Sequence, residues 1–455
     1  MSKKNLVVIG GSGAVSSCVY ETINKTGSFL KTYNLIIIDP QPIKKWFYDF
    51  FPRLKFIQIA LDEDNHEVIL KPFLNSSSIM LDLSVNCDCI FLAKLAQKYG
   101  TIYYNTSLEN WGVDDPSKLH EEQFQDRTLY ARYLKMKKVV NKRTTALIDG
   151  GQNPGMVNLW LKYALETVAK EYGSDKTKKD ASEERFANVA QNLGLKVCIV
   201  SEEDTQKTIK SKPKNMMWNT WSAVGLYAGE ALDPVMTTNS KLSKKVFPDE
   251  DYIIPTTGPK NVMFINKRGC DLKSESYILD DNGKKKKYRG YTIPHGETNS
   301  MSLMLKKTGY ELPVMYYCYK PSDVADETLK QVKKNKYKPL GDGTLDSYHV
   351  MELPELKKEG WDCVGLYLNF SGGECGDLNW FIGSCLTVKF VKDVLKYEHC
   401  TPTTIQVAIF IVTMLEHIVK NEKNLGLVYP EEVSGYKKIL KQCMPYLGIV
   451  YNQKI

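Results

Sequence analysis

The sequence lacks long uninterrupted apolar runs. Its longest mainly apolar run, residues 407–415, lies between Gln406 and Glu416, whereas a spanning helix needs about 20 residues. Near the N-terminus, residues 6–9 form a shorter apolar run than the about 7–15 residues of a signal-peptide core. We therefore expect a soluble cytoplasmic protein that does not bind a membrane, with 407–415 in a buried helix.

The eleven cysteines lack the spacing of a metal clip or of a disulfide framework. Only one residue separates Cys87 from Cys89, and no second close pair follows to complete a zinc site. The count is odd, and the density is below that of small disulfide-stapled scaffolds. We therefore expect reduced cysteines and no metal ligands.

The charge is only moderately unbalanced. The 61 Lys and Arg exceed the 53 Asp and Glu by eight, partly through local lysine runs. Aromatic residues do not alternate with these lysines as they do in single-strand nucleic-acid platforms, so we predict no nucleic-acid partner. Because like charges in a row repel one another, we predict solvated loops at three lysine-rich segments. These are residues 173–185, 284–287 and 330–338.

The length of 455 residues and the 43% of hydrophobic residues predict two to three globular domains. The first, residues 1–148, alternates apolar strands with helices such as Cys89–Tyr99. Strands that are apolar without alternation are covered on both faces, as in a parallel sheet. We therefore predict an α/β fold with a Rossmann-type, doubly wound parallel sheet. Its expected strands are 5–9, 35–38, 56–60, 78–85, 101–105 and 146–148.

Residues 149–399 show a different pattern. Strand-like segments at 196–201, 262–265, 315–319 and 364–370 follow one another with few helices between them. This pattern predicts a second, α+β domain on a mixed or antiparallel sheet. The C-terminal segment, about 400–455, contains a predicted helix at 402–420 and is a candidate to pack back on the first domain.

The first strand leads into a glycine turn of the kind that binds a dinucleotide. Gly11 permits the tight turn, Gly13 lets the backbone approach a pyrophosphate, and the following helix N-terminus adds N–H donors. Ser16 stands where a third glycine is expected, which we expect to loosen the helix–strand packing slightly. The candidate cofactor contacts of this turn are Gly11, Ser12, Gly13, Ala14 and Val15.

An acidic residue ends the second strand. Asp39 lies 26 residues after Gly13, where a carboxylate bonds ribose hydroxyls and repels a 2′-phosphate. This position favours NAD over NADP. The alternative interpretation is a glycine turn in an unrelated α/β protein.

Five further segments are polar or aromatic where core strands would be apolar. They are NTSLENW at 105–111, GGQNPGMV at 150–157, EEDTQ at 202–206, NTWS at 219–222 followed by Glu230, and PHGE at 294–297. Together with the nucleotide domain, these segments resemble the bacterial-type homospermidine synthases of the saccharopine dehydrogenase-like superfamily. The resemblance extends from the glycine turn to PYLG at 445–448.

The resemblance implies an enzyme that holds NAD tightly as a prosthetic group and works as a homodimer, with residues 149–399 as its substrate and dimerisation domain. It implies aminobutyl transfer, which joins two putrescines, or spermidine and putrescine, into homospermidine with loss of ammonia. By the same resemblance, the catalytic residues are Glu202, Trp221, Glu230 and His295. The substrate-binding residues are Glu109, Asn153, Glu202, Trp221 and Glu230, and Thr106 is a further candidate cofactor contact.

The residue chemistry fits a diamine independently. A diamine needs separated anions for its two ammonium groups and an apolar or aromatic wall for its methylenes. The ring of Trp221 can hold an ammonium or iminium group with about 0.5–2 kcal/mol. Each residue also has a simpler interpretation when it is considered alone. Trp221 would then be a core residue, Glu202 part of a solvated strand end, and His295 a hydrogen-bonded turn residue.

The resulting hypothesis is a cycle without net redox change, in which an amine-bearing carbon is oxidised, ammonia leaves, a second amine adds and the imine is reduced. Glu202, Glu230 and His295 are the candidates for moving protons, and their order stays open. One alternative is a carboxyspermidine or saccharopine dehydrogenase, which needs an arginine clamp for a substrate carboxylate. The other is a dinucleotide-binding protein without catalytic activity.

Overall fold

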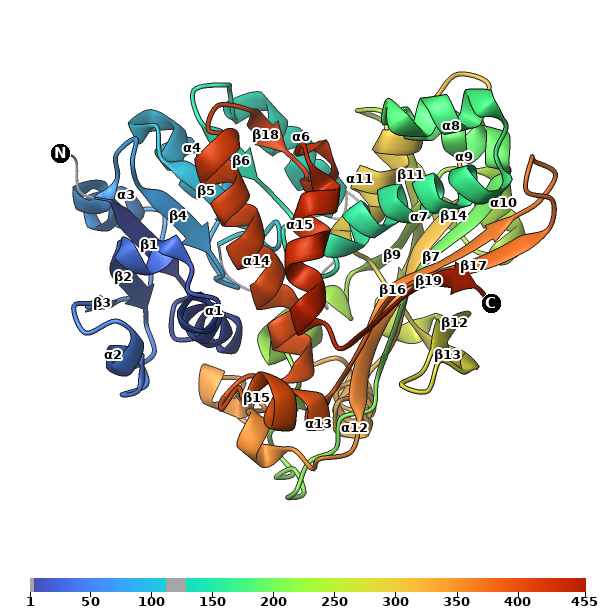
Figure 1. Cartoon of the computed structure of the whole chain (residues 1–455). Helices are drawn as coiled ribbons and strands as arrows, with labels where there is room; N and C mark the ends of the chain where they lie inside the picture. The colour runs from blue at the N-terminus through green and yellow to red at the C-terminus, as the bar shows by residue number, and fades with distance from the viewer. Residues whose placement is uncertain (1–3, 112–127) are drawn as a thin grey trace. The chain divides into compact units, whose positions relative to one another are not determined.

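The computed structural model describes residues 4–111 and 128–455, and the chain divides into two compact units (Figure 1). The first unit contains Met1–Gly155 and Tyr397–Tyr446. The second contains Met156–Lys396 and Leu447–Ile455. The end of the chain therefore differs from our expectation, because the residues after Tyr446 join the second unit rather than the first.

The sheet of the first unit is parallel throughout, with the order β18-β6-β5-β4-β1-β2-β3. The strand order reverses between β1 and β4, which is the switch point where open α/β sheets bind ligands. This arrangement confirms the predicted Rossmann-type sheet. Its strands are β1 Asn5–Ile9, β2 Asn34–Asp39, β3 Lys55–Gln58, β4 Ile79–Asp82, β5 Ile102–Asn105, β6 Thr145–Leu147 and β18 Gly426–Val428.

Three of the longer helices of this unit, α4, α6 and α14, begin at a capping side chain, whereas α1 and α15 do not. Asp88, Thr128 and Thr401 each accept a backbone N–H at the start of their helices, whereas no described side chain caps α1. The helices are α1 Ala14–Lys25, α2 Phe47–Phe50, α3 His66–Leu70, α4 Cys89–Tyr99, α6 Leu129–Val139, α14 Pro402–Asn421 and α15 Tyr436–Cys443.

Helix α14 is the element that contains the apolar run 407–415. Its length and hydropathy would suit a membrane span, but 83% of its most apolar window is buried inside the protein. It packs against α1 as part of the Rossmann layer (Figure 1). The predicted buried helix is therefore confirmed.

The second unit is built on a mixed sheet with the order β12-β13-β14-β7-β16-β17-β19. Within the described residues, β14 and β7 are its only parallel neighbours. The predicted mixed α+β architecture is therefore confirmed, with β7 at the centre. The strands are β7 Leu195–Asp204, β12 Lys273–Leu279, β13 Lys285–Ile293, β14 Val314–Lys320, β16 Trp361–Phe370, β17 Leu378–Thr387 and β19 Ile449–Lys454.

Smaller elements complete the second unit. One minor sheet has the order β10-β11-β9, and another pairs β15 with β8. Their strands are β8 Met217–Asn219, β9 Pro234–Thr238, β10 Tyr252–Ile253, β11 Val262–Arg268 and β15 Tyr348–Val350. The helices are α7 Met156–Tyr172, α8 Asp175–Ser182, α9 Phe186–Leu193, α10 Lys241–Val246, α11 Gly296–Leu305, α12 Asp323–Lys334 and α13 Val388–Phe390, with a π-helix at Gly225–Glu230.

The lysine-rich segments are largely regular structure, so the prediction of loops was wrong. Segment 173–185 contains α8, segment 284–287 starts β13, and segment 330–338 begins with the last turns of α12. In α12 the residues Ala325, Leu329 and Val332 are buried at helical spacing, while the lysines lie on the exposed side. An amphipathic pattern therefore outweighs repulsion between the lysines.

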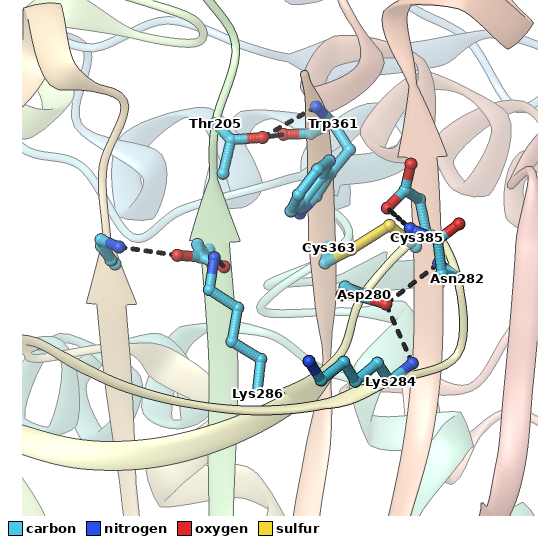
Figure 2. A network of polar contacts seen from close by, with 11 residues as sticks. Thr205, Asp280, Asn282, Lys284, Lys286, Trp361, Cys363 and Cys385 are labelled. Atoms are coloured by element: carbon cyan, nitrogen blue, oxygen red, sulfur yellow. Dashed lines mark hydrogen bonds and ion pairs between the residues drawn. A yellow bond between two sulfur atoms is a disulfide. The ribbon is translucent and has the colours of Figure 1, made fainter. Parts of the chain in front are cut away.

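The expectation of reduced cysteines was also wrong at one pair. Cys363 of β16 and Cys385 of β17 lie directly opposite each other in the antiparallel register and form a disulfide. Figure 2 shows this bond beside the ring of Trp361, two residues earlier on the same face of β16. The pair belongs to the apolar core of this face, together with Ile199 and Phe381.

Candidate active site

The glycine turn connects β1 with α1 at the switch point of the first sheet. Gly10 has a left-handed backbone (φ +71°), and a Cβ there would lie 2.6 Å from the carbonyl oxygen of Leu83. A Cβ at Gly11 would lie 2.6 Å from the Ile37 side chain. Because these positions exclude side chains and α1 has no described cap, the first-turn N–H groups stay available to an anion.

Two side-chain hydroxyl groups fix the glycine turn by hydrogen bonds to its backbone carbonyls. Ser16, at the expected third-glycine position, is buried and its Oγ donates to the carbonyl of Gly10 at 2.8 Å. The Tyr20 hydroxyl donates to the carbonyl of Gly11 at 3.1 Å. Ser16 therefore replaces the close glycine packing with a hydrogen bond to the turn.

Asp39 ends β2 beside the same turn. Its Oδ2 accepts the Ser12 N–H at 3.0 Å, and its Oδ1 accepts the Gln41 N–H at 2.8 Å. A carboxylate offers about four lone-pair positions, so about two remain for ribose hydroxyls. The predicted ribose ligand is thus also a ligand of the phosphate-binding turn.

The carboxyl ends of β4, β5 and β6 lie along the other half of this sheet edge. Asp82 at the end of β4 accepts from Ser84 and Tyr103, and burial raises its pKa to about 6. Thr106 follows β5 directly, next to the turn after β6: a Cβ built on Gly151 would lie 3.9 Å from the Thr106 Cβ.

Two predicted substrate ligands lie on loops of this edge. The Glu109 carbonyl accepts the Cys89 N–H at 3.1 Å and a guanidinium N–H of Arg132, which also bonds Asp88. These contacts fix the loop that carries the partly exposed Glu109 side chain. Asn153 lies in the turn at 149–155 and is also partly exposed. Both residues therefore share an edge with the glycine turn, Asp39 and Thr106.

Strand β7 carries the central carboxylates of the second unit. Glu202 is buried, and its Oε2 accepts the Tyr317 hydroxyl at 2.8 Å. Tyr319 on β14 pairs directly with Glu202, so both point to the same sheet face, and its hydroxyl accepts the Trp221 Nε1–H at 3.1 Å. The structure thus connects Trp221 to Glu202 through two tyrosines that sequence reasoning missed.

The aromatic rings form a continuous row on this face. Trp221 meets Tyr319 edge-on at 6.4 Å, Tyr319 stacks on Tyr317 at 5.6 Å, and Tyr317 packs on His295 at 4.5 Å between ring centroids. The strand predicted at 315–319 contained the signal, because residues 317 and 319 share one face of a strand. The row brings together Trp221 and His295, which lie far apart in the sequence.

His295 lies between two glutamates at the start of α11. Its Nδ1 is 3.0 Å from Glu297 Oε2, and its Nε2 is 3.4 Å from Glu230 Oε2 at the end of the π-helix. Burial alone lowers the pKa of His295, but the charges of Glu297 and Glu230 outweigh it and raise the pKa well above its usual range. The two glutamates therefore favour the protonated, imidazolium form of His295. Glu297 was not among our predicted residues.

Two further acids share the Glu202 face. Asp204 accepts from the Thr220 hydroxyl at 2.7 Å and from Gln206, and burial raises its pKa to about 6. Asp362 of β16 pairs directly with Asp204 and is also buried. This face of the sheet is therefore acidic and aromatic, as a polyamine site requires.

The structure gathers the predicted residues into two groups, one in each unit. The first group contains Gly11, Ser12, Gly13, Ala14, Val15, Asp39, Thr106, Glu109 and Asn153. The second contains Glu202, Trp221, Glu230 and His295, connected by the tyrosine row and by the Glu230–His295 contact.

Comparison with known proteins gives one match within the first unit and others along nearly the whole chain. Residues 6–147 match the family described as "Saccharopine dehydrogenase NADP binding domain". The chain is 26% identical to the homospermidine synthase of Mesorhizobium japonicum, over 98% of this chain and 89% of that protein. It is 24% identical to the homospermidine synthase of Blastochloris viridis, over 98% and 90%.

The solved structures show the same fold. The homospermidine synthase of Legionella pneumophila in complex with NAD has a TM-score of 0.81 and 24% identity, covering 100% of this chain and 92% of that one. The saccharopine dehydrogenase (L-Glu forming) of Saccharomyces cerevisiae has a TM-score of 0.53 and 12% identity over the full length of both. The resemblance to homospermidine synthases is thus confirmed along the whole chain.

Proposed function

We propose that this chain, which is similar over its full length to homospermidine synthases, is an NAD-dependent enzyme that joins two putrescines, or spermidine and putrescine, into homospermidine. The observation that carries the proposal is the acidic and aromatic face of the second sheet. There Glu202 and Asp204 lie beside the Tyr319–Trp221 contact. These side chains suit ammonium groups and methylenes, and they would repel a substrate carboxylate.

The first unit fits NAD. The glycine turn excludes side chains, α1 offers first-turn N–H groups, and Asp39 keeps lone pairs for ribose hydroxyls. The carboxylate of Asp39 would repel a 2′-phosphate, which favours NAD over NADP. When bound, NAD supplies reversible hydride transfer. Gly11, Gly13 and Asp39 would hold it, with Thr106 on the half of the edge beyond the switch point.

The carboxylates would bind and order the amines. Glu202 and Asp204 are buried, so their charges act in a medium of low dielectric, where an ammonium group is the complementary ligand. Trp221, fixed by its bond to Tyr319, offers a ring face to an ammonium or iminium group. Burial of these groups also limits hydrolysis of the imine to an aldehyde.

His295 and its glutamates would move the protons. Because Glu297 and Glu230 flank the ring of His295 and favour its protonated form, we assign it as the acid that protonates the departing amine. Glu230, on the Nε2 side, would accept the proton of the incoming amine, while the buried Glu297 holds the imidazole ring in place. We further propose that the enzyme works as a homodimer in the cytoplasm.

The test is incubation of the purified protein with putrescine and NAD, with products resolved by mass. We expect homospermidine and ammonia without net accumulation of NADH. NADH together with an aldehyde would instead indicate a simple amine dehydrogenase. If putrescine and NAD give no product, while an amine together with a carboxylate-bearing aldehyde or oxo acid consumes added NADH, the chain is a saccharopine or carboxyspermidine dehydrogenase.

A further inference from the structure

The turn at residues 149–155, which follows β6, has a tightly closed backbone. Gly151 N–H donates to the Pro154 carbonyl at 2.7 Å, and Gly151 forms a β-bridge with Gly155. A Cβ at Gly155 would lie 1.9 Å from the Gly151 carbonyl oxygen. Asp149, which enters the turn, is left-handed with φ +59°, a conformation that costs energy in a residue with a side chain. The turn therefore fixes the position of its tip residue, Gln152.

Gln152 is buried, and the described residues give its side-chain amide no hydrogen bond. Its side chain is 2% exposed, and neither its Nε2 nor its Oε1 has a hydrogen-bond partner among the described residues. Gln97, another buried glutamine of the same unit, instead donates to the Thr144 carbonyl and accepts from the Asn141 N–H. Because nearly all buried polar groups are paired, the Gln152 amide indicates a partner beyond residues 4–111 and 128–455 as the structure describes them.

The position of Gln152 indicates which partner this is. Asp39, at the end of β2, marks the side of the switch point that receives the adenosine half of a dinucleotide. Gln152 follows β6 on the opposite side, in the turn that lies against Thr106. The group that reaches it belongs to the nicotinamide half, whose carboxamide has the same pair of donor and acceptor as a glutamine side chain.

We propose that Gln152 recognises the nicotinamide ring by pairing its amide with the carboxamide of NAD. This inference rests on the NAD dependence proposed above and adds a residue that selects the nicotinamide ring. The tight turn at Gly151 and Gly155 sets the geometry of the pairing, so the amide is in place before the dinucleotide binds.

The test measures equilibrium binding by calorimetry on the full-length protein after removal of bound nucleotide. The ligands are NAD, ADP-ribose, which lacks the ring, and nicotinic acid adenine dinucleotide, which carries a carboxylate instead of the carboxamide. In Gln152→Leu we expect NAD to bind about tenfold more weakly and ADP-ribose to bind within about twofold of its original affinity. Gln97→Leu is the matched control, which should lose stability but keep the ratio between NAD and ADP-ribose.

The unaltered protein gives a second test that needs no variant. It should bind NAD at least about tenfold more tightly than the carboxylate analogue, because a carboxylate cannot donate to Gln152 Oε1. Equal affinity for these two ligands would overturn the proposal. So would equal weakening of NAD and ADP-ribose in Gln152→Leu, which would make Gln152 a support of the turn alone. Failure of the unaltered protein to bind either NAD or ADP-ribose would refute the NAD dependence itself.

Discussion

Strand β7 carries acidic residues on both faces, and the side chains that contact these acids differ between the two faces. Glu203 is fully buried on one face, where Lys320 lies 2.7 Å from its Oε1 and Lys286 lies 2.7 Å from its Oε2. On the other face, Glu202 accepts from a tyrosine hydroxyl and Asp204 from a threonine hydroxyl and a glutamine amide. The chain therefore supplies the counter-ions of Glu203, whereas the acids of the other face bond neutral donors and suit a cationic ligand.

The difference teaches how one strand serves both stability and binding. Adjacent residues of a strand point to opposite faces, so Glu203 is separated from the candidate site by the sheet itself. A buried carboxylate without a cation carries a large desolvation penalty. The two lysines offset this penalty for Glu203, and the proposed diamine would bring positive charge to the other face. Three experiments can break or sharpen this comparison, and a fourth extends it to a buried hydroxyl of the first unit.

The largest effect is expected from removing the lysines of Glu203. The double variant Lys286→Met with Lys320→Met should lower the free energy of unfolding by about 3 kcal/mol, because Glu203 keeps a buried charge without a cation. Denaturant unfolding measures this change. Lys287→Met is the matched control, because Lys287 pairs with Glu275 at the exposed surface and should cost at most about 1 kcal/mol. If adding Glu203→Leu to the double variant restores no stability, Glu203 is not the cause.

On the other face, Trp221→Ala should lower kcat/KM for putrescine by up to about 30-fold, through loss of the ring that faces the cation. The affinity for NAD should stay unchanged. Trp221→Phe should keep part of the activity, since phenylalanine retains a weaker π face. Steady-state kinetics with putrescine give the comparison, and an equal loss in both variants would contradict a cation–π role.

The pH dependence of stability tests the burial of Asp204 on the candidate-site face of β7. Burial raises its pKa to about 6, so the folded protein holds a proton that the unfolded chain releases at about pH 4. The ionised carboxyl therefore costs stability progressively as the pH rises from about 4 to about 6. Asp204→Asn should be more stable than the unaltered protein at pH 7, and this advantage should vanish near pH 4. Unfolding curves across this range measure it, and a difference independent of pH would contradict the assignment.

The smallest effect concerns the first unit. Ser16→Ala should lower the free energy of unfolding by about 1 kcal/mol, through loss of the bond to the Gly10 carbonyl. Ser17→Ala is the control, because the Ser17 hydroxyl bonds only back along its own helix, to Gly13. Thermal unfolding distinguishes the two variants. Equal losses would mean that the Ser16 bond does not secure the turn.

Sequence reasoning found the parts of this molecule that depend on local pattern. Apolar strands, the glycine turn and α4 follow from short segments, so the first sheet was predictable. The EED segment at 202–204 was also visible, but its most direct interpretation was a solvated strand end. Its burial depends on β14 and β16 pairing on either side of β7, and such long-range neighbours are absent from a local pattern.

The same limit explains what was missed. Asp362 joins the site only because β16 pairs with β7 in one register, and the disulfide forms only because the same strand pairs with β17. Glu297 matters because α11 starts beside the π-helix that ends at Glu230. Strand β17 combines Gly383 with polar residues and gives a weak strand signal, although Gly383 pairs closely with Gly365 across the sheet.

The two sheets also share an order of assembly. The strand β18, at residues 426–428, forms the edge of the parallel sheet, and β19, at 449–454, forms an edge of the mixed one. During synthesis on the ribosome, each sheet is therefore incomplete until this last strand, 426–428 or 449–454, has emerged. Each unit is assembled from separate stretches of sequence, so neither can be released as a single uninterrupted fragment. We expect the newly made chain to need protection from aggregation until both strands are in place.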